Sequence, residues 1–157
     1  MKKRLLFVCL GNICRSPAAE GVMKSIVKAA GMENEYVIDS AGIGDWHIGQ
    51  LPDQRMRKHG AQRGYLFDSR ARQFNADDFA NFDHIYVMDH ENKRIITAMA
   101  ATKEDAQKVE MLASYLKDKQ NVDVVPDPYY GGDEDFKYAL DLIEIACKEL
   151  FIQLNGK

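Results

Sequence analysis

The chain has 157 residues, of which 46% are hydrophobic, and its 21 basic and 24 acidic residues leave a formal net charge of −3. This length predicts a single domain spanning residues 1–157, with enough apolar side chains for a hydrophobic core. The basic residues are scattered, so we expect no nucleic-acid partner, and no apolar run reaches the ~18 residues that a membrane span needs.

The N-terminus and the cysteines indicate the cellular compartment in which the protein is expected. Residues 1–4 are basic and residues 5–10 are mostly apolar, but this apolar run is too short for a signal peptide, and we interpret it as the first strand. Three cysteines, an odd number, argue against a framework of structural disulfides. We therefore expect a cytoplasmic protein, although export without a leader would leave no mark in the sequence.

The first predicted elements are a strand and a helix joined by a short loop. Residues 5–8 are typical of a buried strand, and residues 15–30 carry apolar side chains at helical spacing. Ser16 is the predicted N-cap of this helix, Pro17 suits its first position, and Gly31 is a natural stop.

Strands and helices then alternate along the chain. Further strands are predicted at residues 36–38, 84–88 and 108–112, and further helices at residues 52–59, stopped by Gly60, and 91–100. A last helix has an apolar face formed by Phe136, Leu140, Ile143, Ala146, Cys147, Leu150 and Leu154. This alternation predicts an α/β fold with a parallel sheet and helices on both faces. Ligands of such sheets bind at the carboxyl ends of the strands, where Cys9 lies.

Cys9 and Arg15 bracket five residues between the first strand and the helix. A thiol at a strand end, a guanidinium and a helix N-terminus together suit a tetrahedral oxyanion. The same groups favour a thiolate, whereas an isolated thiol, with a pKa of about 8.5, is mostly protonated at neutral pH. The pattern therefore predicts phosphate-ester chemistry with Cys9 as the nucleophile and Arg15 as a bidentate phosphate ligand.

The residues around this pair fit the same chemistry. Gly11 allows the backbone to bend so that its N–H groups converge, and Asn12 tolerates a left-handed conformation. Ser16 is expected to donate its hydroxyl to the Cys9 sulfur. Two roles are open for Cys14: it forms a reversible, protective disulfide with Cys9, or it is a small buried side chain that packs beneath the loop.

A leaving group needs a proton, and Asp127 is the best donor in a predicted loop at residues 127–132. Pro128 biases Asp127 toward an extended conformation, and Tyr129 and Tyr130 could flank an aromatic substrate. Ordinary turn chemistry explains an Asp-Pro pair as well, so the spacing alone leaves the role of Asp127 open.

Residues 8–17, VCLGNICRSP, together with residues 127–131, DPYYG, resemble the low-molecular-weight protein tyrosine phosphatase family. Further matches at residues 40–42, 45–46, 71–73 and 88–92 extend the resemblance over essentially the whole chain. The resemblance implies a four-stranded parallel sheet in a three-layer α/β/α architecture, and a two-step mechanism without a metal or other cofactor.

The resemblance also implies individual roles. Cys9 attacks phosphorus, Arg15 and the loop amides stabilise the transferring group, and Asp127 serves as general acid and then as general base. The loop and its support are Leu10, Gly11, Asn12, Ile13, Cys14, Ser16 and Ser40. The walls of a deep aromatic slot are Ile13, Trp46 and Tyr129. Some relatives are phosphorylated on the tyrosines that correspond to Tyr129 and Tyr130, which leaves that modification open here.

Two positions near the loop carry separate expectations. Many relatives have a histidine just before the segment 71–73, where it supports the loop asparagine, whereas this chain has Ser69. We expect the Ser69 hydroxyl to meet Asn12 instead. Asp89 is predicted either to cap the following helix or to support the loop.

The expected partner is a tyrosine-phosphorylated protein, with a tyrosine kinase as one candidate, and the chain is expected to act as a monomer. The four histidines show no metal-ligand spacing with the cysteines, so no metal site is predicted.

One alternative function is that of an arsenate reductase on the same fold, but residues 80–91 lack the further cysteines that such chemistry uses. The other is a non-catalytic phosphotyrosine-binding module, which would be expected if Cys9, Arg15 or Asp127 were missing.

Overall fold

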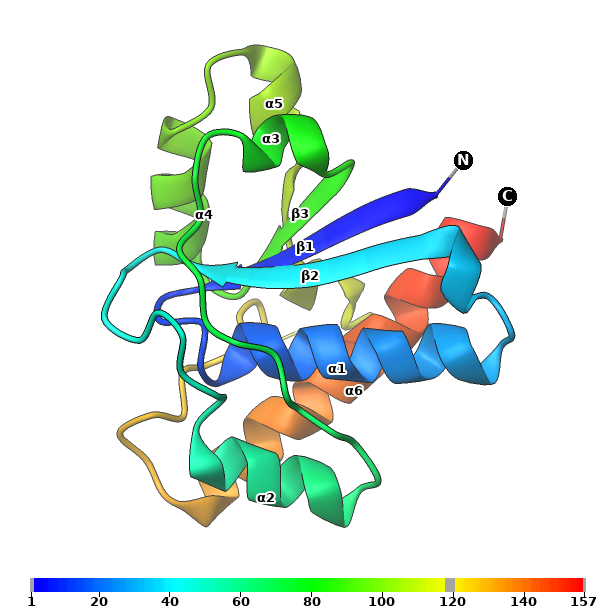
Figure 1. Cartoon of the computed structure of the whole chain (residues 1–157), viewed down its shortest axis with the longest axis vertical. Helices are drawn as coiled ribbons and strands as arrows, with labels where there is room; N and C mark the ends of the chain where they lie inside the picture. Colours follow the sequence, from blue (N-terminus) through cyan, green and yellow to red (C-terminus); the bar gives the residue numbers. More distant parts are fainter. Residues whose placement is uncertain (1, 118–120, 157) are drawn as a thin grey trace.

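The computed structural model describes residues 2–117 and 121–156 and shows a four-stranded parallel sheet between helices (Figure 1). The strands are β1 (Lys3–Cys9), β2 (Tyr36–Gly42), β3 (His84–Val87) and β4 (Val109–Met111), and their order in the sheet is β2-β1-β3-β4. The predicted parallel sheet with helices on both faces is therefore confirmed.

The helices form two layers. The layer on one face consists of α1 (Arg15–Ala29) and α6 (Asp133–Asn155), with α2 (Gln54–Gln62) packed against α6. The opposite layer consists of α3 (Asp78–Asn81), α4 (His90–Ala98) and α5 (Lys103–Gln107). Short 3₁₀ turns lie at Glu33–Glu35 and Leu112–Tyr115.

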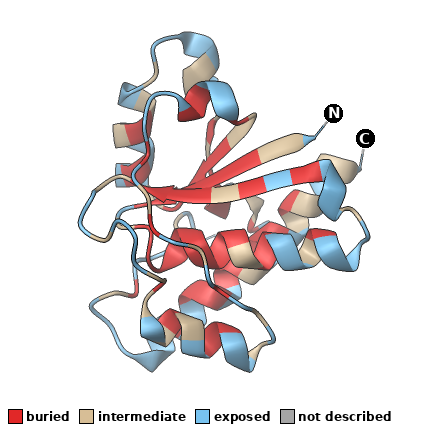
Figure 2. Ribbon diagram, viewed as in Figure 1, coloured by how far each residue is buried: buried red, intermediate tan, exposed pale blue. Residues whose placement is uncertain are grey.

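Residues 5–9 of β1 are buried, whereas Lys3 and Arg4 at its start are partly exposed (Figure 2). Leu5 and Phe7 belong to the core cluster shared with α1 and α6, whereas Leu6 and Val8 belong to the cluster beneath α4. All four side chains are fully buried, and each such burial contributes roughly 1.5–3 kcal/mol of stability. This packing fixes the end of β1, where Cys9 lies.

The order of the strands places a topological switch point at β1. The chain leaves β1 to build β2 on one side and later β3 on the other. The loops that leave the carboxyl ends of neighbouring strands diverge at such a point and open a crevice for ligands. Cys9, the last residue of β1, pairs with Gly42 at this edge.

Several boundaries differ from those predicted. The second strand extends to Gly42 because its register follows β1 from Lys3 to Cys9. Gly60 does not stop α2, which continues to Gln62. Gly60 instead lies against Phe67, where an added Cβ would come within 2.4 Å of a ring carbon.

The short helices α3 and α5 were not predicted, because four or five residues carry too little periodicity. Ser16 is not the N-cap of α1: the cap position is Cys14, and α1 begins at Arg15. Within residues 2–117 and 121–156, none of the helices combines the length and apolar character that a bilayer crossing requires.

Candidate active site

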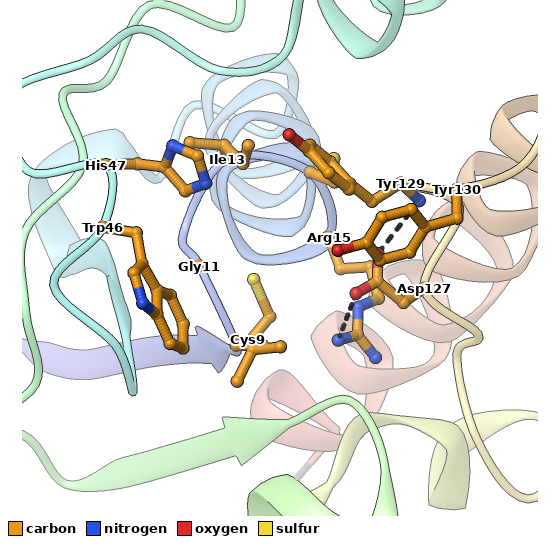
Figure 3. A pocket seen from close by; sticks show the side chains of 11 residues that line it. Cys9, Gly11, Ile13, Arg15, Trp46, His47, Asp127, Tyr129 and Tyr130 are labelled. Atoms are coloured by element: carbon orange, nitrogen blue, oxygen red, sulfur yellow. Dashed lines mark hydrogen bonds and ion pairs between the residues drawn. The ribbon is translucent and has the colours of Figure 1, made fainter.

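The loop of residues 10–14 joins the carboxyl end of β1 to the first turn of α1, so Cys9 lies beside a helix N-terminus (Figure 3). Asn12 in this loop has φ of 57°, a left-handed conformation that asparagine tolerates. The segment that follows β2 is hydrogen-bonded to the start of this loop. The backbone N–H of Ile43 donates to the carbonyl of Cys9 at 3.0 Å, and that of Gly44 donates to the carbonyl of Leu10 at 2.9 Å.

The buried side chain of Asn12 ties the loop to three other segments. Its amide donates to the hydroxyls of Ser16 at 2.8 Å and Ser40 at 2.9 Å, and its carbonyl accepts from the backbone N–H of Arg72 at 3.0 Å. The Ser40 hydroxyl donates in turn to the Glu20 carboxylate at 2.5 Å. Such a satisfied buried network rigidifies the loop before any ligand binds.

The expected contact between Ser69 and Asn12 is wrong. No hydrogen bond joins these two side chains in the described part of the chain, and the backbone of Arg72 occupies the Asn12 carbonyl. The Arg72 guanidinium fixes that backbone by pairing with Asp39 at 3.1 Å and Asp78 at 3.0 Å. An ion-pair anchor thus supplies the support expected from position 69.

The sulfur of Cys9 lies 3.0 Å from the hydroxyl oxygen of Ser16, and either atom could be the donor. Ser16 therefore contacts both the thiol and the Asn12 network. Its position in the first turn of α1, rather than at the cap, brings its hydroxyl under the sulfur.

Arg15 is almost fully buried, and its guanidinium is held by several acceptors. One terminal nitrogen donates to Asp89 at 2.7 Å and to the Val125 carbonyl at 3.0 Å, while the other lies 3.5 Å from Asp127. Its Nε is buried with no hydrogen-bond partner within the described residues. Burial disfavours the charge, but the electrostatic interaction with Cys9 and the hydrogen bond to Asp89 outweigh this effect and raise the pKa of Arg15.

Asp89 fulfils both roles that the sequence left open. One carboxylate oxygen accepts from the backbone N–H of Asn92 at 2.8 Å and caps α4, while the other binds Arg15. The cap therefore fixes the carboxylate that orients the guanidinium.

Asp127 faces the thiol from a loop far along the chain (Figure 3). One carboxylate oxygen accepts from the backbone N–H of Tyr129 at 3.1 Å, and the other lies 3.5 Å from Arg15. The side chain is 36% exposed, so it lies at the mouth of the site rather than within the core.

These groups meet in a pocket of about 340 Å³. Its lining consists of Cys9, Leu10, Gly11, Ile13, Cys14, Arg15, Trp46, His47, Asp127, Tyr129 and Tyr130. Asn12, Ser16 and Ser40 are absent from the lining and lie behind the loop, where they hold its shape. The wall is largely aromatic and the floor carries the thiol and the guanidinium.

Cys14 lines the same pocket, but its thiol is in an environment that disfavours the thiolate. Burial, with a smaller effect of the negative charge of Asp53, raises the pKa of the Cys14 thiol well above its usual range. Cys14 is therefore protonated at neutral pH. All three cysteines are free thiols, and a reversible disulfide between Cys9 and Cys14 stays a prediction. Within the described ranges, no group of three or more metal-ligating side chains is present.

Sequence reasoning missed the contribution of α2. Asp53 caps this helix and donates its backbone N–H to the carbonyl of Ile13 at 2.7 Å, and Arg55 contacts the segment that follows Asp127. No local pattern signals these contacts, because they join segments that are distant in the sequence.

The comparisons with known proteins agree with this geometry. Residues 4–157 match the family model described as low molecular weight phosphotyrosine protein phosphatase. The chain is 42% identical to the low molecular weight protein-tyrosine-phosphatase of Streptomyces coelicolor, over 96% of this chain and 92% of that protein. A crystal structure of a protein tyrosine phosphatase from Entamoeba histolytica superposes with a TM-score of 0.94 and 42% identity, covering 99% of this chain and 98% of that one. The chain therefore belongs to the low molecular weight phosphotyrosine protein phosphatase family.

Proposed function

We propose that the chain hydrolyses phosphotyrosine in proteins through a phosphocysteine intermediate. The observation that carries this proposal is that the Cys9 thiol, the Arg15 guanidinium and the Asp127 carboxylate line one aromatic-walled pocket (Figure 3). A nucleophile, an anion ligand and a proton donor are the groups that transfer of a phosphoryl group from an aryl alcohol requires.

In the first step, the Cys9 thiolate attacks phosphorus and the bond between phosphorus and the tyrosyl oxygen breaks. Asp127 gives its proton to that oxygen, so that neutral tyrosine leaves. Arg15 and the loop amides bind the oxygens of the transferring group, where charge is concentrated in the transition state. Two nitrogens of Arg15, Nε and the terminal nitrogen near Asp127, form the fork that binds the phosphoryl oxygens. The remaining terminal nitrogen is occupied by Asp89 and the carbonyl of Val125.

In the second step, water attacks the phosphocysteine and the sulfur–phosphorus bond breaks. The Asp127 carboxylate takes a proton from this water, which returns the aspartic acid to its starting form. The Ser16 hydroxyl, 3.0 Å from the sulfur, donates to the departing thiolate and makes it a better leaving group.

The walls select the substrate. Ile13, Trp46 and Tyr129 flank the approach to Cys9 and would contact an aromatic ring along its length. Trp46 is 63% exposed, so it can pack on a ring at the pocket mouth. A phosphoserine, whose phosphate lies closer to its backbone, would not reach the thiol as well.

The substrate is a phosphoprotein in this proposal, and a tyrosine kinase is one candidate. The chain would act as a monomer in the cytoplasm and as one domain over residues 1–157. The family match over residues 4–157 supports that single-domain organisation. Neither alternative is favoured: residues 80–91 contain no cysteine for arsenate reduction, and a binding-only module would have no need of Asp127.

A substrate panel tests the proposal. The wild-type protein should hydrolyse phosphotyrosine peptides and p-nitrophenyl phosphate in the presence of a chelator, with vanadate as a competitor, and should leave phosphoserine peptides intact. Thiol-dependent reduction of arsenate without phosphatase activity would favour the reductase instead. Tight binding of phosphotyrosine peptides without turnover would favour the binding module.

A further inference from the structure

Arg55, in the first turn of α2, pairs with the carboxylate of Asp53, and the backbone of Asp53 is hydrogen-bonded to the loop of residues 10–14, here called the phosphate loop. Its Nε donates to one oxygen of Asp53 at 3.0 Å and a terminal nitrogen donates to the other at 2.9 Å, a bidentate pair. The backbone N–H of Asp53 donates to Ile13 at 2.7 Å. Although burial opposes its charge, the hydrogen bonds from Arg55 hold the pKa of Asp53 below its usual range. Both groups are therefore charged at neutral pH.

The same guanidinium reaches across to the segment that follows Asp127. One terminal nitrogen donates to the carbonyl of Tyr129 at 3.0 Å and the other to the carbonyl of Gly131 at 3.4 Å. The guanidinium carbon also lies 5.6 Å from the ring centroid of Tyr129 and 4.5 Å from that of Phe136. Cation–π attraction therefore adds to the hydrogen bonds and holds both the backbone and the ring of Tyr129.

Tyr129 connects this restraint to Asp127. The carbonyl of Tyr129 accepts from Arg55, and the backbone N–H of the same residue donates to a carboxylate oxygen of Asp127 at 3.1 Å. The other carboxylate oxygen of Asp127 lies 3.5 Å from Arg15. A side chain that is 36% exposed has few other restraints, so the position of the Tyr129 backbone sets the direction of the carboxyl group.

We propose that Arg55 is a positioning residue for the general acid, and that it sets the distance between the phosphate loop and Asp127 by clamping Tyr129 to Asp53. This inference rests on the proposed function. It depends on the planar fork of arginine, because lysine cannot donate to a carboxylate and two carbonyls in one fixed geometry.

Two small substrates test the inference, because phenyl phosphate and p-nitrophenyl phosphate differ in how much the leaving oxygen needs a proton. For Arg55→Ala, kcat/KM with phenyl phosphate should fall about 10- to 100-fold, since a catalytic group misplaced by about 1 Å can cost about 10²-fold. The loss with p-nitrophenyl phosphate should be much smaller. Arg55→Lys should show the same split. Lys58→Ala, which removes an exposed positive charge from the same helix, should match the wild type.

A double-mutant cycle separates positioning from general structural damage. In an Asp127→Asn background, Arg55→Lys should cause little further loss, because the acid that it positions is gone. Equal losses with both leaving groups, or a full additional loss in that background, would overturn the inference. If Arg55→Ala does not fold, the Arg55→Lys series decides. A wild-type protein inactive toward both phosphates would reject the proposed function, and this inference with it.

Discussion

Arg15 combines deep burial with a full charge, and its partners decide which of its N–H groups can bind the phosphate in the proposed mechanism. The carboxylate that binds it belongs to Asp89, which is the N-cap of α4 and is held in place by the backbone N–H of Asn92. A pre-oriented guanidinium needs no reorganisation when charge develops on the transferring group, which is the condition for electrostatic catalysis.

Replacing the proposed acid should separate substrates by leaving group. Asp127→Asn should lower kcat/KM for a phosphotyrosine peptide about 10²–10⁴-fold, the usual contribution of general acid catalysis. The loss for p-nitrophenyl phosphate should be far smaller, because nitrophenolate leaves without a proton. The control is Asp123→Asn, a carboxylate with a side chain that is 77% exposed. Equal losses for both substrates would contradict Asp127 as the acid.

The buried Glu20 should stabilise the fold through the loop network. Glu20→Ala leaves the Ser40 hydroxyl without its acceptor and should lower the free energy of unfolding by about 1–3 kcal/mol in urea denaturation. Lys28→Ala is the control, because it removes an exposed side chain from the same helix and should change the free energy of unfolding by less than about 0.5 kcal/mol. A Glu20→Ala variant as stable as the control would contradict this role.

At the scale of elements, local patterns predicted the strands better than the contacts between loops. The apolar run of β1 and the periodicity of α1 appear close to their predicted limits. Ser16 was misassigned because a serine before a helical proline fits an N-cap, whereas its hydroxyl contacts Cys9 and Asn12 in the structure. Ser69 was misassigned because no local pattern shows that the Arg72 backbone reaches Asn12.

Gly60 was predicted to end α2 but lies inside this helix against Phe67, and a substitution tests that contact. Because a Cβ at this position would meet the ring of Phe67, Gly60→Ala should destabilise the protein by about 1–3 kcal/mol, despite the higher helix propensity of alanine. Gln62→Ala, at an exposed position of the same helix, should be nearly neutral. Thermal unfolding of both variants checks this, and a stabilised Gly60→Ala would mean that Gly60 lies free of the ring.

At the scale of the whole molecule, the sequence predicted a parallel sheet but not its order. Pairing of β1 with both β2 and β3 creates the switch point where Cys9 lies, and it depends on long-range contacts between buried faces. The family resemblance supplied the four-stranded, three-layer architecture that periodicity alone could not.

One buried tyrosine, Tyr86, and two half-buried ones, Tyr65 and Tyr115, should make the whole fold sensitive to alkali. Burial raises the pKa of Tyr86 and Tyr65 far above the usual range and that of Tyr115 to about 12. These tyrosines therefore ionise more easily in the unfolded chain than in the folded protein. Their contribution to stability is fully present below pH ~10, the pKa of tyrosine in the unfolded chain, and is lost as the pH rises from there toward the raised pKa of the folded protein. A buried tyrosine contributes a slope of about 1.4 kcal/mol per pH unit there.

Urea denaturation between neutral pH and pH ~11 measures this slope. Tyr86→Phe, which keeps the ring and removes the ionisable group, should make the slope less steep, with Tyr65 and Tyr115 still contributing, whereas Tyr130→Phe at a 96% exposed position should leave it unchanged. An unfolding free energy that stays constant across this range would contradict the burial of these tyrosines.

The most direct test of the mechanism is to trap the covalent intermediate. p-Nitrophenyl phosphate, whose leaving group needs no proton, is mixed with the Asp127→Asn variant, so that Cys9 can be phosphorylated while hydrolysis lacks its general base. The reaction is quenched within milliseconds, and the digested protein is analysed by mass spectrometry. The mass of one phosphoryl group should appear on the peptide that contains Cys9, and it should be absent from Cys9→Ser. A phosphoryl group on any other residue, or a Cys9→Ser variant that still turns over substrate, would contradict Cys9 as the nucleophile.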